Sequence, residues 1–144
     1  MRFPVIEVHY AYRAADPEAM EGVFLVGNRD HLSVQAAEQA LWEALDWNGT
    51  FVADQLGVPE LAPWAYVPAT WNERFDASRH TFLRLRGVSA SEALQSGAMQ
   101  LTHDIQDLIE AAKCAQRAGW QDFVIDNGAR RYGLRGTPRL ALAG

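Results

Sequence analysis

Apolar and polar residues alternate at the start of the chain. Across residues 3–13, Ile6, Val8 and Tyr10 fall on one side, while Glu7 and His9 fall on the other. Strict alternation with β-branched and aromatic residues predicts a strand that buries one face. A second short strand is expected at 22–26, and the two strands most simply form an antiparallel hairpin with an acidic connection.

The next segment has apolar residues at helical spacing. Ser33 is placed to cap a helix that extends to about residue 46, because its hydroxyl can accept a hydrogen bond from a free amide of the first turn. Thr50 is expected to begin a short helix that ends at Leu56, before Gly57. Residues 57–78 show no period, and an ordered irregular loop is predicted there.

The second half of the chain repeats this alternation. Residues 79–87 predict a strand with an apolar side and a mainly cationic side, and the cationic side carries His80, Phe82, Arg84 and Arg86. A capping box between Ser89 and Glu92 predicts a short helix. The longest helix is expected from about Leu101 to Ala118.

The last elements are a strand at 122–126 and a return strand at 130–134, because Asn-Gly between two β runs is a strong hairpin signal. The order is β-β-α-(α)-loop-β-α-α-β-β. It predicts an α+β fold with a largely antiparallel sheet and helices on one face. At 144 residues, the chain is expected to form one domain over 1–144, with about 136–144 as a loosely held basic tail.

Composition narrows the class of protein. Hydrophobic residues make up 49% and charged residues 22%, the balance of an ordered globular protein. The single cysteine excludes an intrachain disulfide and a cysteine-rich zinc site. No phosphate-binding loop, dinucleotide fingerprint, zinc-protease motif or nucleophile elbow is present, so no cofactor is expected. A soluble, cytoplasmic protein is the expectation, because no apolar run approaches the length of a membrane span.

Charge is unevenly distributed. The formal net charge of −5 combines a first half (1–72) at −7 with a second half (73–144) at +2. After Asp126 the chain carries only arginine charges: Arg130, Arg131, Arg135 and Arg139. The acidic half favours a basic protein surface as partner, and the arginine-rich end favours a phosphate or another anion.

Three groups of residues are candidates for a site. If the strands at 3–13 and 79–87 share a sheet, the side chains of Glu7, His9, His80 and Arg84 share its open face with Arg86. A carboxylate beside a histidine, with arginines near, suits acid–base work on an anionic substrate. A solvated face held by cross-strand charge pairs is the simpler interpretation.

The second group is His103, Asp107 and Glu110. Their spacing places them on one side of the predicted long helix, where they form a weak candidate for a transition-metal site. A solvated helix face is the better interpretation of these residues, and no metal is expected. The third group lies in the aromatic–proline loop and either folds into the core or contacts a partner: Trp64, Tyr66, Trp71 and Phe75.

These observations favour a small acidic protein-interaction module, such as an inhibitor, an immunity-type protein or an adaptor. It would bind a partner protein through the acidic hairpin and the aromatic–proline loop. The alternative is a small enzyme or ligand-binding domain that uses the open sheet face on an anionic small molecule. A nucleic-acid accessory protein with an arginine-rich C-terminus is the second alternative, although no DNA-binding motif supports it.

Overall fold

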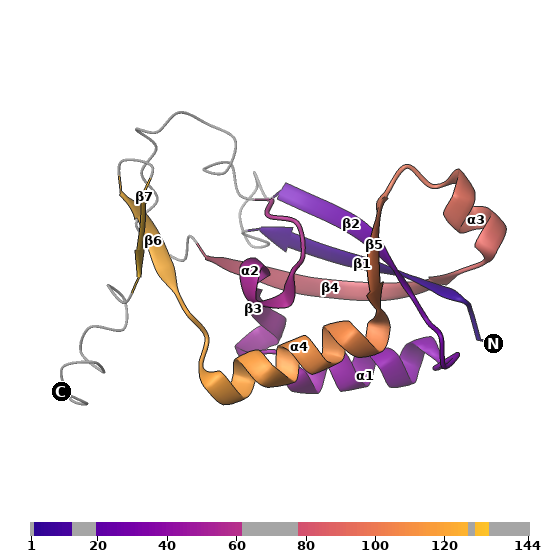
Figure 1. Cartoon of the computed structure of the whole chain (residues 1–144), viewed down its shortest axis with the longest axis horizontal. Coiled ribbons are helices and arrows are strands. Elements are labelled where there is room, and N and C mark those ends of the chain that lie inside the picture. Colours follow the sequence, from indigo (N-terminus) through magenta and orange to yellow (C-terminus); the bar gives the residue numbers. More distant parts are fainter. Residues whose placement is uncertain (1, 13–19, 62–77, 127–128, 133–144) are drawn as a thin grey trace.

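The computed structural model describes residues 2–12, 20–61, 78–126 and 129–132. Its centre is a curled five-stranded sheet in the order β3-β4-β1-β2-β5 (Figure 1). The strands of this sheet are β1 (Val5–Tyr12), β2 (Met20–Gly27), β3 (Thr50–Val52), β4 (Arg79–Val88) and β5 (Met99–Asp104). The fold is therefore α+β, as predicted.

Pairing in the sheet is mixed. β1 pairs antiparallel with both β2 and β4, and β3 pairs antiparallel with β4. β5, in contrast, lies parallel to β2. The prediction of an antiparallel sheet thus holds for the β1–β2 hairpin and the strands beside it, and fails at the β5 edge.

Four α-helices accompany the sheet in the described part of the chain. These are α1 (Val34–Ala44), α2 (Ala53–Leu56), α3 (Ala90–Gln95) and α4 (Ile105–Ala118), and a single 3-10 turn, η1 (Trp47–Gly49), follows α1. Figure 1 shows α1 and α4 side by side against one face of the sheet, which we call the covered face. No helix among the described residues is long and apolar enough to span a membrane.

The core forms between the covered face and these two helices. The alternating Ile6, Val8 and Tyr10 of β1 are all 3% exposed or less, and they pack with Leu41 of α1 and Leu108 of α4. This burial confirms the period-two pattern of β1 and the helical stripe of α1. The predicted caps also form: Ser33 accepts from Ala36 N, and Ser89 and Glu92 make a reciprocal capping box.

Two predicted helices begin later than the sequence suggests. Thr50–Val52 forms β3, so the short helix begins at Ala53. Met99–Asp104 forms β5, and α4 begins at Ile105 with Asp104 as its cap. In both segments, pairing with a neighbouring strand decides the conformation against a local helical signal. The observed order therefore contains two strands that the predicted order lacks.

The predicted faces of β4 are wrong in part because the strand contains a β-bulge. Tyr10 pairs with Phe82 and His9 pairs with Arg84, which leaves Leu83 as an extra residue. An extra residue reverses the alternation beyond it. Before the bulge, His80 and Phe82 consequently lie on the covered face. After the bulge, Arg84 lies on the opposite face, which we call the open face.

β6 (Phe123–Asp126) and β7 (Ala129–Tyr132) form a separate two-stranded antiparallel sheet. This confirms the predicted C-terminal hairpin. Phe123 and Ile125 are buried against Val52 of β3, with Trp120 packed beside them. A small second cluster thus attaches the hairpin to the edge of the main sheet.

Helices do not all lie on one face. α3 follows β4 and leads to β5 on the far side of the sheet, so this crossover passes the intervening strands β1 and β2. Its Glu92 reaches Arg86 of the open face, with 3.6 Å between Arg86 Nη1 and Glu92 Oε2. The prediction of helices on one face is correct for α1 and α4 and wrong for α3.

Candidate functional site

The open face carries a row of charged and polar side chains on two adjacent strands. Glu7 of β1 lies directly opposite Arg86 of β4, and His9 lies opposite Arg84. The strand register therefore brings together three of the four predicted acid–base residues. We call the side chains of Glu7, His9, Arg84 and Arg86 the open-face row.

His9 is held between a carboxylate and a guanidinium. Its Nε2 lies 2.6 Å from Glu7 Oε1, and its Nδ1 lies 3.3 Å from Arg84 Nη2. Arginine can only donate, so Nδ1 must accept and the proton of a neutral imidazole must reside on Nε2. This tautomer allows Nε2–H to donate to Glu7. The result is a continuous chain of hydrogen bonds from Arg84 through His9 to Glu7.

Arg86 closes the other side of Glu7. Its Nε and Nη2 donate to the two carboxylate oxygens of Glu7 at 2.9 Å and 3.3 Å. The hydrogen bond from Arg86 lowers the pKa of Glu7 below its usual value; burial opposes this effect, and the bond from His9 adds to it. The bond to Glu7 in turn raises the pKa of Arg86. Glu7 is thus a carboxylate at neutral pH.

A groove of about 240 Å³ adjoins the row, between the open face and α3. Leu25 and Val88 lie on its floor and are each 1% exposed. Its other lining residues are polar: Glu7, Arg86, Glu92, Gln95 and Ser96. The groove is thus mainly polar and rests on two apolar side chains.

Sequence reasoning did not find the α3 side of this groove. The capping box of Ser89 and Glu92 predicts where α3 begins, but it does not indicate which face of the sheet the helix covers. Which face of the sheet α3 covers depends on the crossover from β4 to β5, and the local pattern in β5 predicts a helix. The segment therefore carried no readable signal for the contribution of Glu92, Gln95 or Ser96.

His80, the fourth predicted acid–base residue, does not belong to the open face. Its side chain is fully buried on the covered face and stacks against Phe51, with 5.9 Å between ring centroids. Its Nε2 lies 2.7 Å from Glu60 Oε2 and 3.1 Å from the backbone nitrogen of Leu61. The bulge at Leu83 is the reason for this correction, because it places His80 and Arg84 on opposite faces.

The predicted metal candidates are separated by the start of α4. His103 lies on β5, Asp107 accepts from the backbone N–H of Asp104 at the helix N-terminus, and Glu110 faces Lys113 at 3.7 Å. In the described ranges, no group of three or more possible ligands is close enough to hold a metal ion. The helical spacing that suggested the group does not apply, because His103 precedes the helix.

None of the predicted binding residues that the structure describes lies in the open-face row. The acidic connection at 14–18 lies outside the described residues, and so do five of the predicted binding residues: Trp64, Tyr66, Trp71, Phe75 and Arg135. Arg130 and Arg131 lie on β7. Arg130 forms an ion pair with Asp54 of α2 and stacks over Phe123 at 4.6 Å, so it helps to attach the hairpin to the main sheet.

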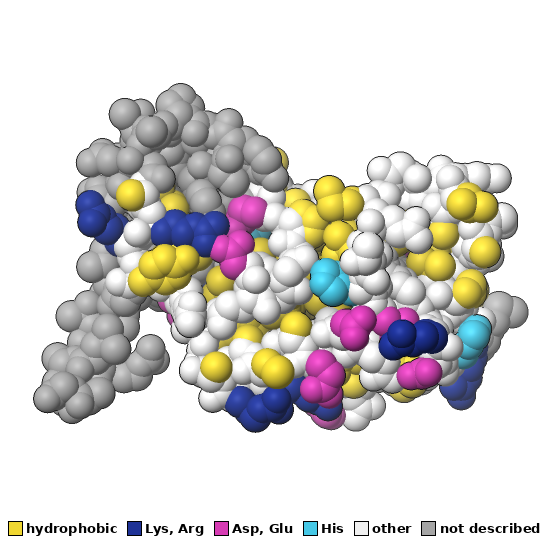
Figure 2. Space-filling model, in the orientation of Figure 1, with side chains coloured by type: hydrophobic (Ala, Val, Ile, Leu, Met, Phe, Trp, Pro, Cys, Tyr) yellow, Lys and Arg dark blue, Asp and Glu magenta, His cyan; other side chains and the backbone are white. Residues whose placement is uncertain are grey.

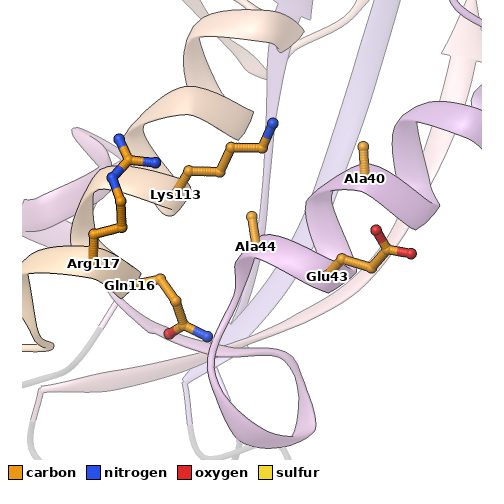
Figure 3. Close-up of a pocket in the computed structure, with 6 residues that line it drawn as sticks. All are labelled: Ala40, Glu43, Ala44, Lys113, Gln116 and Arg117. Atoms are coloured by element: carbon orange, nitrogen blue, oxygen red, sulfur yellow. The ribbon is translucent and has the colours of Figure 1, made fainter.

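A second groove, of about 340 Å³, runs between the solvent sides of α1 and α4. Figure 3 shows that the small Ala40 and Ala44 leave this space open on α1, while longer polar side chains of α4 surround it. Its lining is completed by Glu43, Lys113, Gln116 and Arg117. Along α4 the acidic Asp107 and Glu110 precede the basic Lys113 and Arg117. This side of the molecule therefore presents charges of both signs (Figure 2).

Comparison of the chain with protein-family models, with curated proteins and with solved structures finds no match.

Proposed function

We propose that this protein binds a small ligand with an oxyanion group on the open face. The observation that supports this most directly is that most of the donors of Arg84 are unused in the described part of the chain. Among the described residues its guanidinium has one hydrogen-bond partner, the neutral Nδ1 of His9, and no carboxylate within ion-pair distance. Four of its five N–H donors are therefore available to a ligand, and arginine matches the geometry of carboxylates and phosphates.

The neighbouring arginine explains why Arg84 is the residue that binds. Arg86 already donates to Glu7 through two nitrogens, and Glu92 lies 3.6 Å from its third. An anion placed at Arg86 would have to compete with two carboxylates. At Arg84 it competes only with an imidazole, so an anionic group is held there and the rest of a small ligand extends along β4 into the groove.

Binding agrees with the geometry better than catalysis. A carboxylate–imidazole pair can act as a general base when the remaining ring nitrogen faces a nucleophile or the substrate. In the described residues, Nδ1 of His9 faces Arg84 instead of a hydroxyl or thiol. The pair therefore orients a binding group, and the ligand-binding form of the open-face hypothesis is the one we adopt.

The test is a titration of the full chain with inorganic sulfate at pH 6, followed by NMR and calorimetry. We expect the resonances of His9 and Arg84 to shift. Arg84→Gln should weaken binding roughly 10- to 100-fold, because a charge-assisted hydrogen bond contributes about 1.5–3 kcal/mol. Arg117→Gln, which removes an exposed arginine of α4 on the other side of the molecule, is the matched control. Equal affinity of Arg84→Gln and the unsubstituted protein would refute the proposal.

A protein-interaction module is the second candidate, on a different surface from the two predicted ones. Trp47 is 78% exposed and Trp42 is 50% exposed at the end of α1. Large exposed tryptophans are typical of interface hot spots. The acidic Glu43 between them suits a basic partner. Trp47→Ala should abolish capture of such a partner and leave the melting temperature unchanged; capture that persists would argue against this surface.

A further inference from the structure

His9 Nδ1 and Arg84 Nη2, 3.3 Å apart, form a pair in which one atom accepts and the other donates. An anion that binds Arg84 through Nη2, on the side of His9, meets this acceptor. An oxygen that carries no proton would lie opposite the lone pair of Nδ1, and two acceptors in contact repel each other. On this side of Arg84 the anion is therefore accommodated only if a proton lies between Nδ1 and the ligand oxygen.

We propose that the open face binds its oxyanion together with one proton, which is shared between His9 Nδ1 and the ligand. The inference rests on the proposed function and adds what regulates it. With the proton in place, both Nδ1–H and the Arg84 guanidinium donate to the same anionic group. His9 thereby becomes a specificity-determining residue: it favours the ligand at low pH, or a ligand that brings its own proton, such as the monoanion of a phosphate ester.

The charges around His9 support this coupling. Glu7 faces it at 2.6 Å and stabilises an imidazolium through Nε2–H, while Arg84 opposes it from β4. On β2 the residue directly across from His9 is the uncharged Val23. Glu21, two positions before Val23, is the exposed acid on this side of β2.

The net charge of the site changes sign with this proton. The open-face row and Glu92 of α3 form one charged cluster. In it, the negative charges of Glu7 and Glu92 cancel the positive charges of Arg84 and Arg86. With His9 neutral, the cluster consequently carries no net charge and attracts an anion weakly. Protonation of His9 makes the cluster cationic and supplies the second donor in the same step. Both effects act in the direction of tighter anion binding at lower pH.

Sulfate is the appropriate probe because it brings no proton in this pH range. We expect its affinity to rise roughly tenfold as the pH falls from 8 to 7, which is the dependence of one linked proton. Calorimetry at pH 7.5 in two buffers of different ionisation enthalpy should report uptake of close to one proton per sulfate. NMR should show that sulfate raises the protonated fraction of His9 at pH 7.

The variants separate this inference from the proposed function. His9→Gln keeps an amide that can donate and accept but cannot titrate, so sulfate should bind with little dependence on pH. His31→Asn removes an exposed histidine of the loop before α1 and should leave the dependence intact. Arg84-dependent binding with the same affinity at pH 6 and pH 8, or a pH dependence that survives in His9→Gln, overturns the proton linkage alone. Absence of Arg84-dependent binding at any pH overturns both.

Discussion

Glu7 joins His9 and Arg86 in the open-face row. Its carboxylate receives His9 Nε2 at 2.6 Å and two nitrogens of Arg86, and its side chain is 12% exposed. A carboxylate held this way stabilises the folded state only while it is ionised. The residue therefore links stability to pH as well as orienting His9.

The direction of this linkage follows from the lowered pKa of Glu7. Above the pKa of an unfolded glutamate, about 4.3, Glu7 is ionised in both states and its stabilisation is fully present. As the pH falls toward the lower pKa of the folded state, that stabilisation is lost. Urea unfolding at pH 3 to 5 should accordingly show the free-energy difference between the unsubstituted protein and Glu7→Gln decline with falling pH. A difference that stays constant would contradict the assigned contacts.

Arg79 connects three parts of the chain through one side chain. It donates to Asp122 at 2.5 Å and 2.8 Å and to Asp46 at 2.7 Å, and it lies 5.5 Å from the ring centroid of Trp120. Burial alone lowers the pKa of Arg79, but the bonds to Asp122 and Asp46 outweigh it and raise the pKa. The guanidinium is thus the common partner of two carboxylates near the β6–β7 hairpin.

Loss of this guanidinium should be costly. Arg79→Met leaves two carboxylates close together in a partly buried place, and we expect a loss of about 3 kcal/mol in the free energy of unfolding, as for other ion pairs broken from one side. Lys113→Met, at an exposed position of α4, should change it by less than about 0.5 kcal/mol. Chemical denaturation measures both, and equal stability of the two variants would show that Arg79 makes no net contribution.

At the scale of elements, the junction of β5 and α4 is fixed by Asp104. This residue is 6% exposed, and its carboxylate accepts from the backbone N–H of Gln106 at 3.1 Å and of Arg29 at 2.7 Å. Asp107 accepts from the Asp104 N–H in return, which completes a capping box. One side chain therefore begins the helix and also holds the loop after β2.

Asp104→Ala removes both bonds, and it should lower the free energy of unfolding by about 2 kcal/mol, the upper part of the range for N-caps. Asp104→Asn keeps an oxygen that can accept and should lose less than half of that. Thermal and urea unfolding of the two variants provide the comparison. If both lose the same amount, the negative charge and not the cap is what stabilises this junction.

For the whole molecule, the arrangement of two sheets implies unequal local stability. β1 is hydrogen-bonded on both sides and packs against α1 and α4, whereas among the described strands β6 and β7 pair only with each other. Isolated two-stranded hairpins are marginally stable, and this one depends on its small cluster with Val52.

Native-state hydrogen exchange should show this difference. We expect the amides of Ile6 and Val8 to exchange only through global unfolding, and those of β7 to exchange at least about tenfold faster through local opening. Exchange of β7 at the rate of β1 would mean that the hairpin and the main sheet unfold as one unit.

Several elements were readable from the sequence because their signals are local. The alternation in β1, the Ser33 cap of α1, the capping box of α3 and the Asn-Gly hairpin each depend on residues a few positions apart. Glu7 and His9 were placed together for the same reason, since residues two apart on a strand share a face.

What the sequence by itself determined, then, is an α+β chain with these local elements and an open sheet face that carries Glu7, His9 and an arginine. Tertiary structure decided which strands pair and which histidine reaches that face. The bulge at Leu83 exposes Arg84 beside His9 and buries His80, and the parallel addition of β5 forms a strand where a helix was expected. Both outcomes depend on hydrogen bonds and burial between segments that are distant in the chain. Contacts of this kind cannot be predicted from the local periodicity of the sequence.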